Sequence, residues 1–359
     1  MLVIGAGVTG LTSALHLAER GVSTCVIDAR PRPGMEASTH NSGVIHAGLY
    51  YPPGSLKGRL CLEGRDALYD FCARHDVPHR RSGKLVVADD PAREAELEAI
   101  AANARANGAR AELLGRREIA EREPAVDAAL ALWSPDTGIV DAARLVSALA
   151  ARAQTAGAIV LPHTPLARAV VDAGGFIVDT GREQIRASVV VNAAGLFADE
   201  VSRALAGETF RIWACRGDYA ELRGRAAARF RVPTYPMPER SGHGLGVHFT
   251  PTMDGTVMLG PTARYQESKT DYESCRPPLD AFLEAAQRLV PSIRLEDLRE
   301  GGSGIRAKLH PEHESFADFM IRADAIQPRL VHAAGIDSPG LTACLAVGRM
   351  VADLVQARL

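Results

Sequence analysis

The stretch LVIGAGVTGLTSALHLAERGVSTCVID, residues 2–28, decides the fold. A short apolar run meets the pattern Gly5-x-Gly7-x-x-Gly10, an amphipathic segment follows, and a second apolar run ends at Asp28. This order predicts a strand, a glycine turn, a helix and a second strand, which is the context that makes a GxGxxG motif specific. The chain is therefore expected to open with a Rossmann-like βαβ unit.

Such a unit has physical reasons to bind a dinucleotide. The glycines allow a tight turn, close approach of the backbone to a pyrophosphate, and close packing of helix on strand. The helix N-terminus offers free N–H groups and a partial positive charge to phosphates. Asp28 can accept hydrogen bonds from a ribose diol. The residues expected to contact the dinucleotide here are Gly5, Gly7, Val8, Thr9, Gly10, Asp28, Ala29 and Arg30.

Composition is that of an ordinary globular chain. Of 359 residues, 47% are hydrophobic and 23% are charged, and the net charge is −2, which gives no basic field that would favour nucleic acid. The six cysteines form no CxxC pair, which favours a reducing compartment. No apolar run reaches the ~18 residues of a membrane span. We expect a cytoplasmic protein. This composition is also compatible with peripheral contact with the inner membrane.

Hydrophobic periodicity places further pieces of the first domain far along the chain. The expected helices and strands are helices over 56–75, 91–108 and 277–289, strands over 84–88 and 187–195, and strand–helix–strand over 138–161. The predicted fold is α/β, with a Rossmann-like domain of the glutathione-reductase type and an inserted mixed or antiparallel β-sheet domain for the substrate. The expected boundaries are 1–83, 138–210 and 300–359 for the first domain, and 84–137 and 211–299 for the second.

The end of the chain favours FAD over a nicotinamide dinucleotide. Residues 331–342, VHAAGIDSPGLT, read as a strand, a glycine-rich turn and the start of a long helix. Two helix N-termini suit a long cofactor that is held at both ends. The partial positive charge of the second one would stabilise the negative charge that builds on the N1–C2=O side of reduced flavin. An ordinary connection that closes the sheet is the alternative for this segment alone.

Several longer motifs carry a resemblance to a known family. They are SxHNSGVIHAGLYYPPGSLKGRLCLEG (38–64), GKLVVA (83–88), NAAGLFAD (192–199), RGDY (216–219), YPMP (235–238) and GLGVHFTPTMDGTVMLGP (244–261). The pattern resembles the FAD-dependent oxidoreductases of the D-amino acid oxidase superfamily and, more closely, is similar to their L-2-hydroxyglutarate oxidase/dehydrogenase branch. The C-terminal SPGLTACLAVG is more like the superfamily at large.

The resemblance implies a path for the flavin. Residues 38–42 would follow the pyrophosphate and ribityl chain, Gly43 and Val44 would lie under the isoalloxazine, and His46 would lie near the ring. A hydrogen-bonding role of His46 is favoured over covalent attachment. With Gly304 and Arg306, the further residues expected at the cofactor are Ser38, Thr39, His40, Asn41, Ser42, Gly43, Val44, Leu166, Ala194, Gly195, Gly335, Ser338, Gly340, Leu341 and Thr342.

Oxidation of a 2-hydroxy acid needs a base for the hydroxyl proton and cations for carboxylates. His46 and His248 are rival bases. In GSGIRAKLHP, residues 302–311, an extended backbone would put Arg306 and Lys308 on one face, which suits a dicarboxylate. The resemblance also implies that Arg306 holds the substrate carboxylate.

Other polar residues receive weaker assignments. Tyr50, Tyr51, Lys57 and Tyr235 are candidates for the pocket wall, and a packing or surface role is the alternative for each. His310-x-x-His313 has the spacing of metal ligands but lacks a third ligand, so no metal is expected.

Three functions stay open. The first is FAD-dependent oxidation of a small 2-hydroxy acid, with L-2-hydroxyglutarate leading. The second is oxidation of a C–N bond in glycine, sarcosine or a D-amino acid, and the third is a non-catalytic nucleotide-binding protein of the same fold. The expected partners are a small carboxylate and an electron acceptor, either O2 or a quinone.

Overall fold

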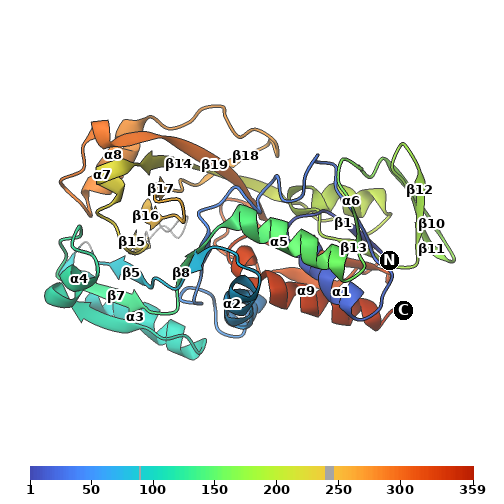
Figure 1. Cartoon of the computed structure of the whole chain (residues 1–359), viewed down its shortest axis with the longest axis horizontal. Coiled ribbons are helices and arrows are strands. Elements are labelled where there is room, and N and C mark those ends of the chain that lie inside the picture. The colour runs from blue at the N-terminus through green and yellow to red at the C-terminus, as the bar shows by residue number, and fades with distance from the viewer. Residues whose placement is uncertain (89, 239–245) are drawn as a thin grey trace.

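The fold is described from a computed structural model, for residues 1–88, 90–238 and 246–359. Gly244 and Leu245 of the last long motif lie outside the described residues. Figure 1 shows one sheet with its helices at the end that carries both termini, and a larger sheet at the opposite end.

A six-stranded sheet joins three distant parts of the chain. Its strands, in spatial order, are β20 (Met320–Ala323), β21 (Leu330–Ala334), β13 (Val190–Asn192), β1 (Leu2–Ile4), β2 (Cys25–Ile27) and β9 (Ile159–Leu161). All neighbours run parallel except β20 and β21. Nearly every residue of the central strands is buried, as expected for a parallel sheet covered on both faces. The predicted Rossmann-like α/β fold is confirmed.

Helices α1 (Val8–Glu19) and α9 (Gly340–Gln356) pack closely because small residues meet at their crossing. An added Cβ on Gly348 would lie 2.6 Å from the Thr12 backbone. The Thr12 hydroxyl lies 2.9 Å from the Cys344 carbonyl oxygen and can donate to it. Helices α2 (Leu56–Arg74) and α5 (Ala142–Thr155) flank this pair, and Asp141 caps α5 by accepting from the Arg144 N–H. The start of the chain is thus fastened to its end.

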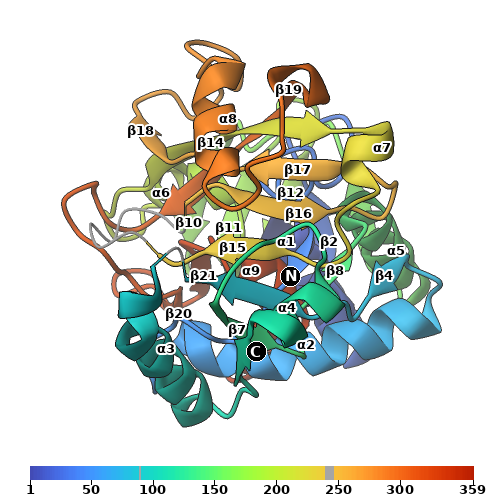
Figure 2. The same cartoon turned by 90° about the vertical axis from the view of Figure 1, so that its left-hand side faces the viewer.

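The larger sheet has nine strands and is mostly antiparallel (Figure 2). Its strands are β5 (Lys84–Val87), β6 (Glu112–Gly115), β7 (Leu130–Ser134), β14 (Trp213–Leu222), β15 (Thr234–Pro236), β16 (His248–Pro251), β17 (Val257–Gly260), β18 (Arg264–Gln266) and β19 (Leu298–Lys308). Strand β19 pairs with β14 from Leu298 to Lys308. The expected boundary at residue 300 therefore falls inside a strand of this sheet.

The remaining elements are short. Two three-stranded sheets are formed by β3 (Val44–Ile45), β8 (Gly138–Val140) and β4 (His79–Arg80), and by β10 (Arg168–Asp172), β11 (Gly175–Asp179) and β12 (Gln184–Ala187). The other helices are α3 (Glu94–Ala106), α4 (Arg116–Arg122), α6 (Ala198–Ala204), α7 (Gly224–Ala227) and α8 (Leu279–Gln287), with 3-10 turns at Pro91–Arg93, Gly195–Phe197 and Leu295–Asp297. The predicted helices over 56–75, 91–108 and 277–289 are present as α2, α3 and α8.

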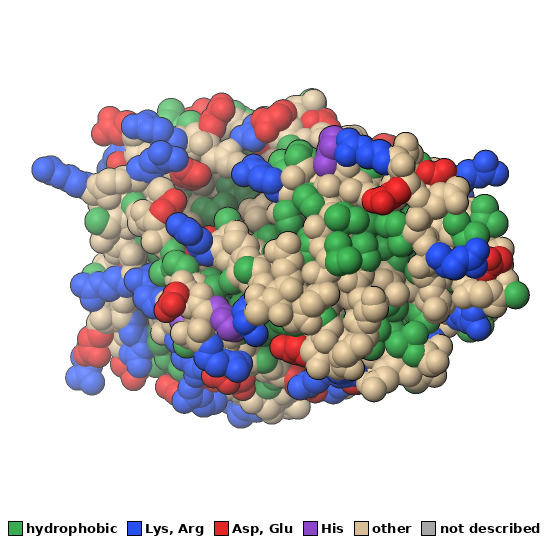
Figure 3. Space-filling model, turned by 45° about the vertical axis from the view of Figure 1, so that its right-hand side comes forward, with side chains coloured by type: hydrophobic (Ala, Val, Ile, Leu, Met, Phe, Trp, Pro, Cys, Tyr) green, Lys and Arg blue, Asp and Glu red, His purple; other side chains and the backbone are tan. Residues whose placement is uncertain are grey.

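Charges of both signs are mixed on the face shown in Figure 3, and hydrophobic side chains gather near its centre. Among the described residues, no helix combines the length and apolar character needed to cross a membrane.

Candidate active site

A cavity of about 990 Å³ runs between the two large sheets. Its wall contains residues from the first strand, the glycine turn, the 36–51 segment, strands β16 and β19, and the turn before α9. The predicted site residues that line it are Gly5, Gly7, Val8, Thr9, Asp28, Ala29, Arg30, Ser38, His40, Asn41, Ser42, Val44, His46, Tyr50, Leu166, Ala194, Gly195, Tyr235, His248, Gly304, Arg306, Lys308, Ser338, Gly340 and Leu341. The structure thus brings these residues together around one cavity.

Five predicted residues shape the cavity from behind its wall. An added Cβ on Gly10 would lie 1.9 Å from the Gly5 carbonyl oxygen, so close packing is the role of this glycine. Gly43, at φ +63°, and Gly335, at φ +65°, adopt left-handed conformations that favour glycine. Thr39 donates a hydrogen bond to the Gly34 carbonyl, and Thr342 is fully buried.

The nucleotide end combines free backbone groups with one carboxylate. Helix α1 has no side-chain cap at its N-terminus, and one of its first N–H groups, that of Val8, donates to the Ser38 hydroxyl at 3.0 Å. The Asp28 carboxylate accepts from the N–H groups of Ala6 and Arg30, at 2.6 and 2.8 Å. Burial raises the pKa of Asp28, and these two hydrogen bonds oppose that shift.

The segment from Ser38 to His46 is a loop held by its own side chains. The Asn41 amide donates to the carbonyls of Ala37 and Ser38, and its oxygen accepts from the Gly43 N–H at 2.8 Å. An added Cβ on Gly43 would lie 2.5 Å from the Val140 carbonyl oxygen. Gly43 thus lets the loop pass close to β8. The neighbouring Ser42 and Val44 line the cavity.

These features fit an FAD. Two long helices, α1 and α9, begin at the same cavity, and neither N-terminus has a side-chain cap. Such termini stabilise negative charge. Around the first of them the glycines leave no room for a Cβ: one on Gly7 would lie 2.8 Å from the Ser38 hydroxyl. The Asp28 end suits the adenosine ribose and the α9 end suits the pyrimidine edge of a flavin.

The substrate end lies where β19 meets the cavity. Arg306 and Lys308 both line it, as expected from alternate positions of an extended strand. Ile305 and Ala307, between and beside them, also border the cavity, but their side chains are buried in an apolar cluster. The Arg306 guanidinium donates to the Thr262 carbonyl at 3.3 and 3.4 Å, and no carboxylate of the described residues pairs with it. The Arg306 guanidinium can therefore bind an anion.

Lys308 has a different environment. Its ammonium lies 3.7 Å from the Asp337 carboxylate and 3.3 Å from the His310 ring. Lys57 pairs with the same carboxylate at 2.6 Å, and the side chains of Lys57 and Asp337 are each only 7% exposed. The three charges sum to +1, so the cluster keeps some attraction for an anion.

The two predicted bases occupy separate positions. His46 lies beside the turn before α9, with its Nε2 atom 3.2 Å from the Ser338 hydroxyl. Burial, and then the nearby Lys84 charge, lower the pKa of His46 to about 3, so its imidazole is neutral at physiological pH. His248 begins β16 and stacks on Tyr235, with ring centroids 3.5 Å apart. Both imidazoles line the cavity.

Sequence reasoning missed several residues of this site. Tyr219 and Asp337 line the cavity, and Lys84 lies behind Tyr50 and Tyr235. Lys57 and Tyr51, by contrast, were candidates for the pocket wall, and both line the cavity. The available signal was the scarcity of lysine: the chain has four, and three of them, Lys57, Lys84 and Lys308, are in or beside this cavity.

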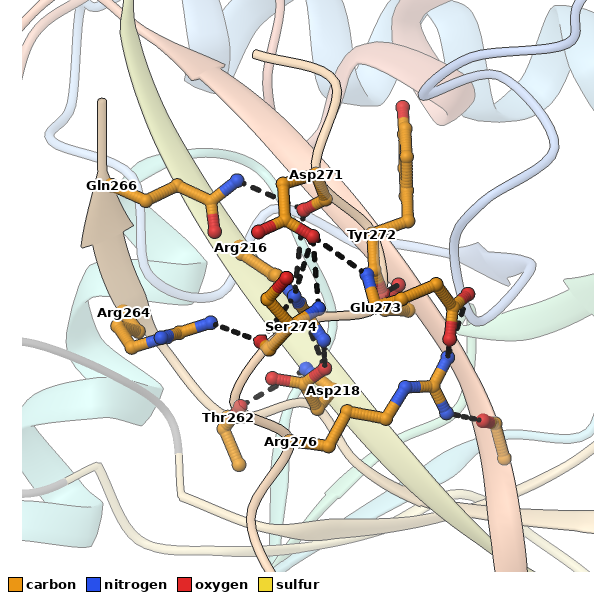
Figure 4. A network of polar contacts seen from close by, with 12 residues as sticks. Arg216, Asp218, Thr262, Arg264, Gln266, Asp271, Tyr272, Glu273, Ser274 and Arg276 are labelled. Atoms are coloured by element: carbon orange, nitrogen blue, oxygen red, sulfur yellow. Dashed lines mark hydrogen bonds and ion pairs between the residues drawn. The ribbon is translucent and has the colours of Figure 1, made fainter. Parts of the chain in front are cut away.

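The RGDY motif braces the cavity wall (Figure 4). Arg216 is fully buried and donates to the Asp218 carboxylate at 2.9 and 2.5 Å and to the Ser274 carbonyl at 2.8 Å. Beyond this network, the Tyr272 hydroxyl donates to Glu36, and the ring of Tyr272 lies 5.0 Å from that of His40. These contacts thus hold the 262–276 segment against residues 36–51, which we call the cofactor loop.

Two groups with metal-ligand chemistry lie outside the cavity. His310, of the His310-x-x-His313 spacing for which no metal was expected, is buried, whereas the His313 side chain is 81% exposed. Glu208, Asp324 and His332 do converge, a cluster that the sequence did not reveal. Arg322 already pairs with Glu208 at 2.7 Å, and Asp324 accepts from three backbone N–H groups and lies 2.8 Å from the His332 ring. This is a satisfied structural cluster.

Comparison with known proteins agrees with this geometry. Residues 1–354 match the family model of the FAD dependent oxidoreductases, DAO. The mitochondrial L-2-hydroxyglutarate dehydrogenases of Arabidopsis thaliana and Homo sapiens are 32% and 31% identical, covering 98% and 100% of this chain and 82% and 89% of their own. The L-2-hydroxyglutarate dehydrogenase of Salmonella houtenae is 30% identical, covering 99% of this chain and 93% of its own.

Solved structures share the fold. The FAD-bound L-alpha-glycerophosphate oxidase of Mycoplasma pneumoniae superposes with a TM-score of 0.90 at 23% identity, covering 99% of this chain and 94% of its own. The glycine oxidase of Geobacillus kaustophilus gives 0.85 at 22% identity, with the same coverage. Family match, relatives and cavity agree: the chain belongs to the FAD-dependent oxidoreductases of the DAO family, and its cofactor is FAD.

Proposed function

We propose that the protein oxidises a small 2-hydroxy acid, with L-2-hydroxyglutarate as the leading substrate and the 2-oxo acid as product. The observation that carries the proposal is the Arg306 guanidinium, which lines the cavity without a carboxylate partner among the described residues. The imidazoles of His46 and His248, the two predicted bases, line the same cavity. The names of the relatives support the choice of acid.

Each residue has one task in this proposal. Arg306 binds the carboxylate next to the reacting carbon, because its planar fork of donors matches a carboxylate. The bound flavin supplies the acceptor for the hydride from C2. An imidazole accepts the hydroxyl proton as the C–H bond breaks, which requires a neutral ring at working pH. His46 is neutral because burial lowers its pKa to about 3, but the same shift makes its ring a weak base. His248 is its rival.

The remaining assignments concern the other residues that line the cavity and the electron acceptor. Lys308, Tyr50 and Tyr235 bind the rest of the substrate, and either O2 or a quinone reoxidises the flavin. Contact with the inner membrane would accompany the quinone. Residues 84–137 and 211–299, with most of β19, form the substrate side in this proposal.

Anaerobic mixing tests the function directly. The flavin-loaded protein is mixed with L-2-hydroxyglutarate, its D-enantiomer, 2-hydroxybutyrate, glycine and sarcosine, and the flavin absorbance is followed. We expect rapid bleaching by L-2-hydroxyglutarate. Bleaching by an amine alone would replace the proposal with C–N oxidation, and a flavin that nothing reduces would favour a non-catalytic role.

A further inference from the structure

Lys84 lies directly behind the wall of the substrate cavity. It is the first residue of β5 and only 1% exposed. Its Nζ atom lies 4.4 Å from the centroid of the Tyr235 ring and 4.8 Å from that of Tyr50. Both rings line the cavity. An anion bound against these rings would therefore lie in the electric field of the Lys84 ammonium.

No negative charge of the described residues balances this ammonium. The other three lysines each pair with a carboxylate: Lys57 and Lys308 with Asp337, and Lys269 with Asp199. Within residues 1–88, 90–238 and 246–359, no carboxylate lies within the 4 Å ion-pair distance of Lys84. A buried ammonium without a counter-ion is unfavourable, so an anion that arrives beside it gains more than it would at a paired lysine.

The titratable groups around Lys84 are also neutral at pH 7. They are His46 and Tyr50 in the cofactor loop, Cys61 in α2 and Tyr235 in β15. Burial lowers the pKa of His46 to about 3 and raises that of Cys61 to about 12. Burial raises the pKa of both tyrosines as well. Burial also lowers the pKa of Lys84 itself, to about 7, and its charge is therefore only partly present in the empty site.

We propose that Lys84 is a specificity-determining residue that supplies the positive charge for a second carboxylate, so that the site prefers dicarboxylate 2-hydroxy acids over monocarboxylate ones. The inference rests on the proposed function and deepens it. Arg306 holds the carboxylate beside the reacting carbon, and Lys84 stabilises the far carboxylate from behind Tyr50 and Tyr235. The Lys57–Asp337–Lys308 cluster is the competing source of positive charge.

Binding of two unreactive acids tests the inference without turnover. Glutarate carries two carboxylates and pentanoate one on the same five-carbon chain, and neither has the 2-hydroxyl group. Dissociation constants are measured on the flavin-loaded protein by perturbation of the flavin spectrum. We expect Lys84→Met to weaken glutarate about tenfold or more, on the scale of a lost charge interaction, and to leave pentanoate nearly unchanged. Lys84→Arg, which keeps the charge, should retain the preference for glutarate.

Several outcomes would overturn the inference. They are a wild-type protein that binds glutarate no more tightly than pentanoate, an unchanged preference in Lys84→Met, or loss of the preference in Lys308→Met alone. Failure of the proposed function can be distinguished from failure of this inference. In that case no 2-hydroxy acid bleaches the flavin, although glutarate still binds and its affinity still depends on Lys84.

Proton linkage provides a second measurement on the unaltered protein. A carboxylate beside Lys84 raises the pKa of its ammonium, so glutarate binding should take up protons between about pH 7 and about pH 9. Calorimetry in two buffers of different ionisation enthalpy measures this uptake. Lys84→Arg should show none in that range, and equal uptake in both proteins would contradict the assignment.

Discussion

The backbone N–H of His46 donates a hydrogen bond of 2.9 Å to the hydroxyl of Thr342, which is fully buried in the first turn of α9. The same hydroxyl lies 3.4 Å from the Val44 carbonyl and can donate to it. One threonine thus fixes the loop that carries a predicted base to the helix whose N-terminus lines the cavity. The relative position of the two depends on this side chain.

Thr342→Val should therefore weaken the attachment of the loop that carries His46 to the N-terminus of α9. The substitution keeps the shape but leaves the buried His46 N–H without a partner, which typically costs about 1–3 kcal/mol. We expect a lower melting temperature and faster loss of FAD, measured by differential scanning fluorimetry and by flavin release. Thr342→Ser keeps the hydroxyl and should lie close to wild type. Equal behaviour of the valine and serine variants would contradict the role of the hydrogen bond.

Gly10→Ala should prevent the cofactor site from forming. The new methyl group would lie 1.9 Å from the Gly5 carbonyl oxygen, so the helix must move away from the turn that receives the phosphates. Purified variant protein should be colourless, as read from the ratio of flavin to protein absorbance. Gly115→Ala is the matched control because a Cβ there meets nothing within 4 Å. Normal flavin content in Gly10→Ala would refute the packing argument.

Removal of Lys57 should destabilise the protein more than removal of the whole Lys57–Asp337 pair. Lys57→Met leaves the buried Asp337 with only the more distant Lys308, and breaking such a pair typically costs about 3–5 kcal/mol. The double variant Lys57→Met/Asp337→Asn should recover much of that loss. Chemical unfolding of the four proteins in the cycle measures the coupling free energy, and a value near zero would show that the pair is not coupled.

The pH dependence of the reductive half-reaction should separate the two bases. If His46 is the base, its low pKa keeps the ring unprotonated, and kcat/KM should not fall between about pH 8 and about pH 5 through protonation of this residue. His46→Ala should then abolish rapid flavin reduction, while His248→Ala should not. An acid limb near pH 6.5 that persists in His46→Ala would assign the proton transfer elsewhere.

Stability should depend on pH through Lys84. Its pKa is about 7 in the folded protein and about 10.5 ordinarily, so between these values the unfolded chain binds more protons and stability rises with pH. Below about pH 7 the Lys84 ammonium is charged in the folded protein as well, and the free energy of unfolding is lowered by the full cost of burying that charge. Lys84→Met lacks this charge, so it should melt above wild type at pH 7, and the difference should shrink toward pH 10. A constant difference would contradict the shifted pKa.

Much of the fold was predictable because the deciding signals are local. The glycines of residues 5–10 and 335–340 mark turns at helix starts, and hydrophobic periods of 3.6 predicted α2, α3, α5, α8 and α9. The length of β19 was not predictable in this way. Its Gly301, Gly302 and Gly304 weaken the strand signal. Gly304 pairs with Gly217 of β14, whereas Gly301 and Gly302 lie where the register shifts, and pairing on both sides of that shift continues the strand.

The cofactor half of the site was predictable for the same reason, and the substrate half was less so. Arg306 and Lys308 alternate along one strand, so their common face follows from the sequence. The pairing of Lys57 with Asp337 joins residues 280 positions apart, and the approach of Lys84 to Tyr50 and Tyr235 depends on three separate segments. Contacts of this kind arise from tertiary packing, which no local pattern records.

Residues from Ile4 to Leu341 contribute to one cavity wall, and this has a consequence for biosynthesis. Translation delivers the glycine turn of residues 5–10 long before the turn of residues 335–340, so a nascent chain that has not reached residue 341 cannot form the whole cavity wall. Yellow colour in a freshly expressed sample therefore reports that synthesis has passed residue 341 and that the two ends of the chain have found each other.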